Sequence, residues 1–261
     1  MLRRLSCCLL VLLSITQLLA QSCTTPTEEA AGTGNLAGTA QADFWRQQLR
    51  FPRVRVAYEA VGPGVANLLR THYLDARRLE IMVRVIKTNR ELEVWARNQN
   101  RGPFELLQTY PLAATSGKLG PKRRAGDRQV PEGFYEIDRF NPKSDYHLSL
   151  GLNYPNAADR ALGEPQPGGD IFIHGGEVTI GCLPITDAGI EEVYLLAVAA
   201  RAAGQAAIPV HIFPFPITEK ELSKRPNSPH VAFWRGLMSG YAHFEKHHDV
   251  QAAPARLVAS E

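Results

Sequence analysis

The apolar positions in the middle of the chain follow the pattern of β-strands. Residues 79–86 and 91–96 are two extended, apolar-rich runs on either side of the polar turn Thr88-Asn89-Arg90, which is the signature of a hairpin. Further apolar runs predict strands at residues 104–112, 133–137, 146–152, 171–174 and 208–215. A meander of this kind favours an antiparallel sheet over repeated βαβ units.

Helical spacing appears toward both ends of the chain. Residues 42–50 and 62–74 are two short amphipathic segments, the second beginning at Gly62-Pro63-Gly64, and we expect them to pack on the outside of the sheet. Asp187 is predicted to cap a third helix, whose apolar face includes Ile190, Val193 and Tyr194. Ser228-Pro229 is predicted to open a C-terminal helix, because serine caps a helix and proline suits its first turn. The expected fold class is therefore α+β, a mostly β domain with peripheral helices.

Length and composition predict one domain. The chain has 261 residues, of which 44% are hydrophobic, enough for a single sizeable core. We assign this domain to residues 42–250. Residues 23–41 are rich in Thr, Gly and Ala with almost no large apolar groups, so we expect a flexible linker. Residues 251–261 are expected to form a loose tail.

Residues 1–22 have the pattern of an export signal. A basic start is followed by an apolar stretch from about Leu5 to Leu19, which is shorter than the ~20 residues that a bilayer-spanning helix requires. Cys23 follows directly and leaves two alternatives open: membrane anchorage through a lipidated Cys23, or ordinary signal cleavage nearby. Either alternative predicts a protein exported to the bacterial cell envelope, in the periplasm or tethered to its membrane.

The charge balance argues against nucleic acid as a partner. There are 29 Lys+Arg against 26 Asp+Glu, a net charge of +3. Removing Arg3 and Arg4 with the leader leaves 27 − 26 = +1, which lacks the strong positive charge typical of nucleic-acid-binding proteins. His243, His247 and His248 lie near the end of the C-terminal helix, where histidines commonly interact with the helix dipole. We therefore expect no metal and no other cofactor.

Cys182 and His174 form a candidate nucleophile and base. A free thiol with a pKa of about 8.5 is only slightly ionised at neutral pH, so attack on a carbonyl needs a neighbouring base. The two residues are 182 − 174 = 8 positions apart, more than about 20 Å along a straight strand. The chain must fold back between them, and Gly175, Gly176 and Gly181 suit such a reversal.

Gly181 has a second predicted role. Its amide and that of Cys182 are candidates to point into the site and stabilise an oxyanion, the main electrostatic requirement of acyl transfer. Cys182 also precedes a helix N-terminus, whose partial positive charge modestly favours a thiolate. The alternative is structural: Cys182 is a buried core cysteine, and His174 is a strand-end histidine satisfied by a backbone carbonyl.

Two loops are candidates for substrate contact. Residues 116–133 are rich in glycine, proline and basic side chains; they form either a solvated basic loop or a wall of the site that meets substrate carboxylates, with Arg128 as the first candidate. Ser116 in the same loop and Gly175 beside His174 are further candidates. Residues 153–170 form a long polar loop before the catalytic strand, a common position for a binding loop or lid.

Several segments together resemble one known family. They are residues 116–137 (SGKLGPKRRAGDRQVPEGFYEI), the NPKSDYHLSL and YPNAADRA segments, IHGGEVTIGC and HIFPFPIT. The pattern is similar to the L,D-transpeptidase catalytic domain (YkuD) family and, over roughly residues 80 to 247, to its YafK-like branch. The commoner family pattern is Ser-His-Gly-Cys with a longer gap to the histidine, whereas this chain has Thr179-Ile180-Gly181-Cys182, the form usual in that branch.

The resemblance implies an enzyme acting on peptidoglycan stem peptides, with Cys182 in the nucleophile's place and His174 in that of the proton acceptor and donor. Members of the branch resemble amidases that cut the bond between diaminopimelate and a lysine of a covalently attached lipoprotein. Water as acceptor gives a hydrolase, and an amine gives a transpeptidase; the residues do not choose between them. The alternatives from other classes are a non-catalytic peptidoglycan-binding module and a structural envelope lipoprotein.

Overall fold

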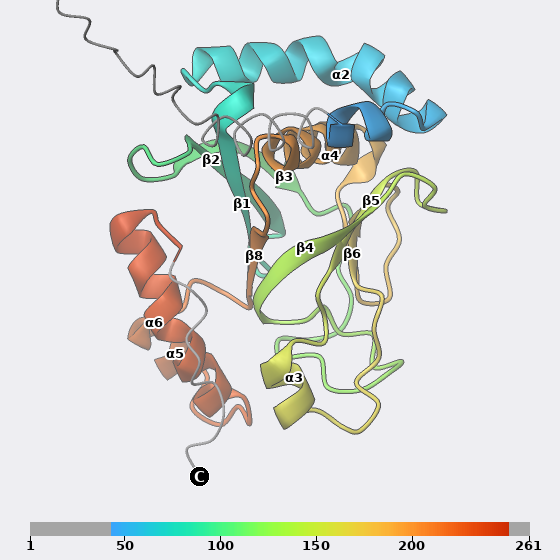
Figure 1. Ribbon diagram of the computed structural model, residues 1–261. Coiled ribbons are helices and arrows are strands. Elements are labelled where there is room, and N and C mark those ends of the chain that lie inside the picture. The colour runs from blue at the N-terminus through green and yellow to red at the C-terminus, as the bar shows by residue number, and fades with distance from the viewer. Residues whose placement is uncertain (1–42, 251–261) are drawn as a thin grey trace, which may run out of the picture.

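The computed structural model describes residues 43–250, which fold around one mixed sheet. The predictions for residues 1–22, 23–41 and 251–261, including anchorage at Cys23, lie outside the described residues. Eight strands follow the order β3-β2-β1-β8-β4-β5-β6-β7 (Figure 1). Their bounds are β1 Leu79–Ile86, β2 Glu91–Asn98, β3 Glu105–Pro111, β4 Gly133–Asn141, β5 Ser149–Leu152, β6 Phe172–His174, β7 Leu183–Pro184 and β8 Ile208–Phe213.

The predicted hairpin is confirmed, but the sheet is not wholly antiparallel. β1 and β2 pair antiparallel from Leu79 opposite Asn98 to Ile86 opposite Glu91. β1 pairs parallel with β8, and β6 pairs parallel with β7. Parallel neighbours need long crossover connections, and pairing between strands so distant in the chain leaves no local signal in the apolar pattern.

The first long helix begins earlier than predicted. Residues 43–48 are helical, and α2 spans Pro52–Thr71, so Gly62-Pro63-Gly64 lies inside the helix and does not open it. Pro52 starts α2 because proline is suited to the first helical positions. Pro63 is tolerated because it lies on the exposed side, where water can bind the carbonyl that loses its amide partner.

α4 (Thr186–Ala202) forms the core with one face of the sheet. Its buried positions include the predicted apolar face at Ile190, Val193 and Tyr194, and α2 packs over its other side (Figure 1). The helix begins one residue before Asp187, and Asp187 is not its cap. Instead the Asp187 side chain accepts a hydrogen bond from the amide of Gly176 at 2.8 Å.

α6 (Val231–His247) covers part of the opposite face of the sheet. Trp234, Leu237 and Tyr241 pack there with Ile86 of β1 and Phe213 of β8. The cap is His230, so the helix begins slightly later than predicted. The remaining short helices of the described residues are α5 (Glu219–Ser223), α3 (Ala157–Leu162) within the predicted long loop, and the 3-10 helix η1 (Ala76–Arg78). Within residues 43–250, none of the helices is long and apolar enough to span a bilayer.

Candidate active site

The register of two short strands places Cys182 and His174 on one face of the sheet. In the parallel pair β6–β7, Ile173 is the partner of Leu183, so Cys182, one residue earlier, stands opposite Phe172. Side chains alternate between faces along a strand. Ile173 and Leu183 accordingly point into the main core, while Cys182, Phe172 and His174 share the other face. We call this second face of β4 to β7 the site face.

The sulfur of Cys182 is half-buried and faces a backbone carbonyl. Its thiol donates to the carbonyl oxygen of Asp170, with Sγ and O 3.6 Å apart. Burial raises the pKa of Cys182 above its ordinary value; the backbone amide of Phe172 opposes this shift, the Asp170 charge adds to it, and the Lys122 charge lowers it again. Burial is the largest influence, so the resting group at neutral pH is the thiol and ionisation needs a base.

The His174 ring is held in one orientation. Its Nδ1 lies 2.5 Å from the carbonyl oxygen of Gly175, which assigns the proton to Nδ1 and leaves Nε2 as the acceptor. The Tyr146 ring packs against the imidazole with centroids 4.7 Å apart. Burial lowers the pKa of His174, partly opposed by the bond to Gly175. Among residues 43–250, no hydrogen bond links this ring to the sulfur of Cys182.

Thr179 organises the turn that carries the nucleophile. Its Oγ1 accepts hydrogen bonds from the amides of Gly181 at 3.1 Å and Cys182 at 2.8 Å, and its hydroxyl donates to the Cys182 carbonyl at 2.9 Å. The two amides expected to stabilise an oxyanion therefore converge on the threonine oxygen in this conformation, and an oxyanion role for Gly181 stays a prediction. A hydroxyl bonded to amides two and three residues later is a known turn motif, so Thr179 was detectable in the sequence.

Gly181 is required for the close approach of the loop at residues 116–132. Its φ is +139°, and a Cβ there would lie 3.0 Å from the carbonyl oxygen of Gln129. This contact places the loop against the turn of Cys182. Arg128, next to Gln129, is exposed, so contact with substrate carboxylates stays a prediction for it. The Oγ of Ser116 is buried and has no hydrogen-bond partner among residues 43–250, and contact with substrate stays a prediction for Ser116.

Gly175 holds the imidazole of His174 in place. It is buried, its amide donates to the Tyr146 carbonyl at 3.0 Å, and its own carbonyl holds the imidazole of His174. A Cβ would collide with Asp187 and with the Tyr146 carbonyl. In this structure Gly175 orients His174, and its contact with substrate stays a prediction.

A buried ion pair anchors the loop at residues 116–132. Nζ of Lys87, at the end of β1, lies 2.7 Å from Oε1 of Glu132 and donates to the carbonyls of Lys118, Gly120 and Val130. Oε2 of Glu132 accepts a bond from the indole of Trp234 on α6 at 2.8 Å. Burial lowers the pKa of Lys87, and Glu132 opposes this shift. The loop is thus fixed to both β1 and α6.

No metal site is formed by the described residues: His, Cys, Asp and Glu side chains nowhere gather in threes around a point that would hold an ion. The chemistry available at this site comes from a thiol, an imidazole and backbone dipoles. Together they suit attack of sulfur on a carbonyl carbon with the imidazole as base.

Comparison with known proteins identifies a family and relatives. The family model for the L,D-transpeptidase catalytic domain matches residues 80–212. "Putative L,D-transpeptidase YafK" of Escherichia coli (strain K12) is 35% identical over 168 residues, which cover 64% of this chain and 67% of that protein. The protein of the same name from Escherichia coli O157:H7 matches with the same values.

Solved structures resemble the chain more distantly. The crystal structure of the helical cell shape determining protein Pgp2 from Campylobacter jejuni is 21% identical with a TM-score of 0.43, covering 64% of this chain and 57% of that one. Bd1075 of Bdellovibrio bacteriovorus is 25% identical with a TM-score of 0.38, covering 64% and 58%. The chain thus spans less than two thirds of either structure.

Proposed function

Because this chain belongs to the L,D-transpeptidase catalytic domain family, we propose that it is a cysteine-dependent acyl-transfer enzyme acting on peptidoglycan stem peptides. The expected fold class is confirmed as that of the family, a mixed sheet with peripheral helices. The observation that carries the proposal is the register of β6 and β7, which sets Cys182 and His174 on the same face of neighbouring strands.

The first half of the reaction forms a thioester. Rotation of the Cys182 side chain takes the sulfur from the Asp170 carbonyl toward the imidazole, and the thiol proton passes to Nε2 of His174. Sulfur bonds to the substrate carbonyl carbon, and the tetrahedral intermediate collapses by breaking the C–N bond. The imidazolium returns its proton to the leaving amine, so the charge balance of the site is restored.

The second half releases the acyl group. Water, or an amine, attacks the thioester carbonyl while His174 takes a proton from the attacking group. The tetrahedral intermediate then collapses by breaking the C–S bond, and the imidazolium returns the proton to the leaving sulfur. We propose water as the acceptor and the diaminopimelate–lysine bond to an attached lipoprotein as the target, since the chain resembles the YafK-like branch. With an amine acceptor the same residues make a transpeptidase that cross-links peptides or attaches protein.

The neutral imidazole suits this cycle. Since burial lowers the pKa of His174, the ring stays unprotonated at neutral pH and is available as the base. The bond from Nδ1 to Gly175 keeps the correct tautomer, because only Nε2 is left with a lone pair. Residues 1–22 support the further proposal that the enzyme works in the cell envelope, with lipidated Cys23 or a soluble periplasmic form as the two alternatives.

The test uses purified protein and peptidoglycan that carries a covalently attached lipoprotein. Wild type and Cys182→Ala are incubated with this material, and the released products are analysed by mass spectrometry. Release of lipoprotein by wild type alone supports the hydrolase. New cross-links from wild type alone support the transpeptidase, whereas identical products from both proteins remove the thiol mechanism and favour a non-catalytic binding module.

A further inference from the structure

A row of paired residues crosses the site face and ends at the nucleophile. Arg139 on β4 is the partner of Gly151 on β5, and Gly151 is the partner of Phe172 on β6. Phe172 in turn stands opposite Cys182. Paired residues on adjacent strands point to the same face of a sheet, so Arg139 and Phe172 share their face with the sulfur.

The missing side chain of Gly151 lets Arg139 lie across β5. A Cβ at position 151 would be 2.6 Å from Nε and 3.1 Å from Nη2 of Arg139, so any larger residue would push the arginine away. The guanidinium reaches the ring of Phe172, 5.1 Å from its centroid, and Nη2 donates to the carbonyl of Leu152 at 3.3 Å. The cationic group is therefore held toward the strand next to Cys182.

Asp170 supplies the opposite charge at the same place. Its carbonyl accepts the Cys182 thiol bond, so its side chain begins directly beside the sulfur. The carboxylate is 83% exposed and lies 3.5 Å from Nη1 of Arg139, which is itself 45% exposed. Arg139 also pairs with Asp138 at 3.1 Å. An exposed ion pair contributes little to stability, and the Asp170 charge disfavours the thiolate. Neither stability nor thiol activation therefore accounts for the pair of Asp170 and Arg139.

Two opposite charges at this spacing complement an α-amino-acid centre. An ammonium group pairs with the carboxylate of Asp170, and a carboxylate group pairs with the planar guanidinium of Arg139. Diaminopimelate has two such centres joined by a short alkyl chain. When one of them offers its carbonyl to Cys182, the other remains a free ammonium and carboxylate a short distance away.

We propose that Asp170 and Arg139 form a subsite for the free amino-acid centre of diaminopimelate, with Gly151 providing the space for the arginine. This proposal rests on the proposed function for the identity of the acyl donor. The subsite selects stem peptides whose third residue carries both charges, and it holds the scissile carbonyl next to the sulfur.

The test compares three synthetic stem peptides. One contains diaminopimelate, one has the carboxylate of its free centre amidated, and one lacks the amine of that centre. For Asp170→Asn we expect kcat/KM for the first peptide to fall by about tenfold and that for the amine-free peptide to stay within about twofold. For Arg139→Gln we expect the same fall for the first peptide, whereas kcat/KM for the amidated peptide should stay within about twofold. Gly151→Ala should reproduce the arginine variant because it displaces the guanidinium.

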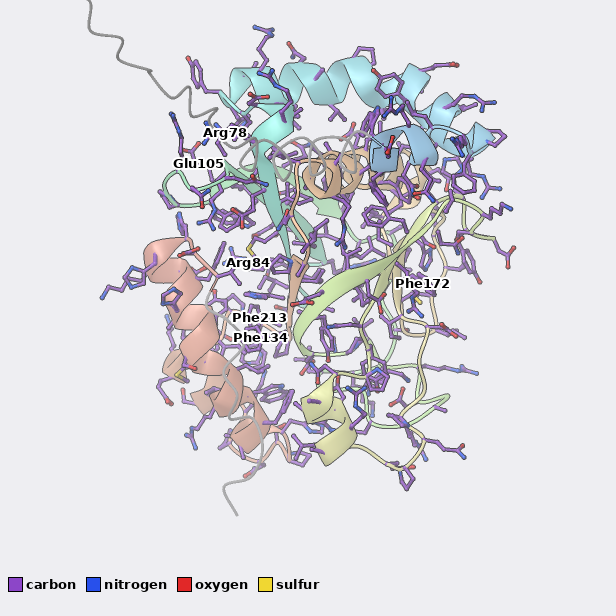
Figure 2. All side chains as sticks on the ribbon, viewed as in Figure 1. Arg78, Arg84, Glu105, Phe134, Phe172 and Phe213 are labelled. Atoms are coloured by element: carbon purple, nitrogen blue, oxygen red, sulfur yellow. The ribbon has the colours of Figure 1, made fainter. Side chains whose placement is uncertain are left out.

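The matched control is Glu105→Gln. Glu105 is an exposed carboxylate on the edge strand β3, far across the sheet from Phe172 on β6 (Figure 2). Its removal should leave kcat/KM for all three peptides unchanged. If Asp170→Asn and Arg139→Gln lower kcat/KM equally for all three peptides, or leave it unchanged, the subsite is contradicted while the enzyme activity stands.

A binding measurement separates this proposal from the activity. Calorimetric titration of Cys182→Ala with the three peptides reports the subsite without turnover, and we expect the diaminopimelate peptide to bind about tenfold more tightly than either analogue. If wild type turns over none of the peptides but this preference is present and lost in Asp170→Asn, the subsite stands and the proposed function falls. Equal binding of all three contradicts the subsite.

Discussion

The hydroxyl oxygen of Thr179 lies 2.8 Å from the amide nitrogen of Cys182 and accepts its hydrogen bond. The same oxygen holds the amide of Gly181, so one side chain fixes the backbone that carries the nucleophile. Whether those amides act on an oxyanion depends on this threonine. The relationship therefore bears on both the position of the sulfur and the charge it can stabilise.

Replacing Thr179 tests whether its main effect is to position the sulfur or to occupy the two amides. Thr179→Val keeps the shape of the side chain and removes three hydrogen bonds, so we expect kcat to fall by about ten- to a hundredfold because the sulfur loses its fixed position. Thr179→Ser keeps the hydroxyl and should stay within about threefold. Steady-state kinetics on a stem peptide measure both. A valine variant as fast as wild type or faster would show instead that the hydroxyl obstructs the two amides.

The dependence of turnover on pH follows from the pKa values of His174 and Cys182. Burial lowers the pKa of His174, so the imidazole remains a base until the pH falls below its usual value of about 6.5. Burial raises the pKa of Cys182, so alkylation of the thiol by iodoacetamide should increase only on the alkaline side. In His174→Gln the acid limb of the pH–rate profile should disappear with most of kcat. An alkylation rate already maximal at neutral pH would contradict this assignment.

Acid stability depends on His211, which is buried among aromatic rings. Phe134 and Phe213 pack against it, and its Nδ1 has no hydrogen-bond partner in the part of the chain that the structure describes. Burial, aided by the Arg84 charge, lowers its pKa from 6.5 to about 3. The unfolded chain therefore binds a proton between these values and the folded chain does not, so stability is lost as the pH falls through this range.

The expected slope is about 1.4 kcal/mol per pH unit from this one group. The free energies of unfolding of wild type and His211→Phe are measured in urea at several pH values between 6.5 and 3. The slope of this free energy against pH should be smaller in the variant by about that amount. His247→Gln, an exposed histidine on α6, is the control and should keep the wild-type slope. Equal slopes for all three proteins would contradict a neutral His211 in the folded state.

The buried pair of Lys87 and Glu132 gives a prediction for stability. Lys87→Met leaves the carboxylate of Glu132 buried without its cation, which should cost about 3–5 kcal/mol. The double variant Lys87→Met/Glu132→Gln removes both charges and keeps one of the two acceptor oxygens that now bind the Gly120 amide and the Trp234 indole, so it should recover part of this loss. Urea unfolding measures both proteins. A double variant less stable than the single one would contradict the explanation.

The sequence predicts the parts of this structure that depend on neighbours in the chain. The hairpin around Thr88-Asn89-Arg90 and the apolar face of α4 follow from local periodicity, and both were found where expected. The motif containing His174 and Cys182 was also visible, since glycines and a thiol near a histidine form a local pattern. The early start of α2 was missed because a proline inside a helix is usually disfavoured, whereas Pro63 lies within α2 on its exposed side.

The remaining parts depend on contacts between distant strands. Arg139 meets Gly151 only through the register of β4 and β5, which shifts between Ile137 and Arg139, and no periodicity fixes such a shift. The burial of Gly175 and of the Ser116 hydroxyl likewise follows from loops that close over them. Contact with substrate stays a prediction for these two residues, as it does for Arg128.

The most direct measurement of the central claim is the covalent intermediate itself. Wild type is mixed with a diaminopimelate-containing stem peptide, quenched with acid within a single turnover, digested and mapped by mass spectrometry. We predict an acyl group in thioester linkage on Cys182, accumulating before product in wild type, strongly reduced in His174→Ala and absent in Cys182→Ala. Product formed by Cys182→Ala at the wild-type rate, or an acyl group attached to another residue, would contradict the account.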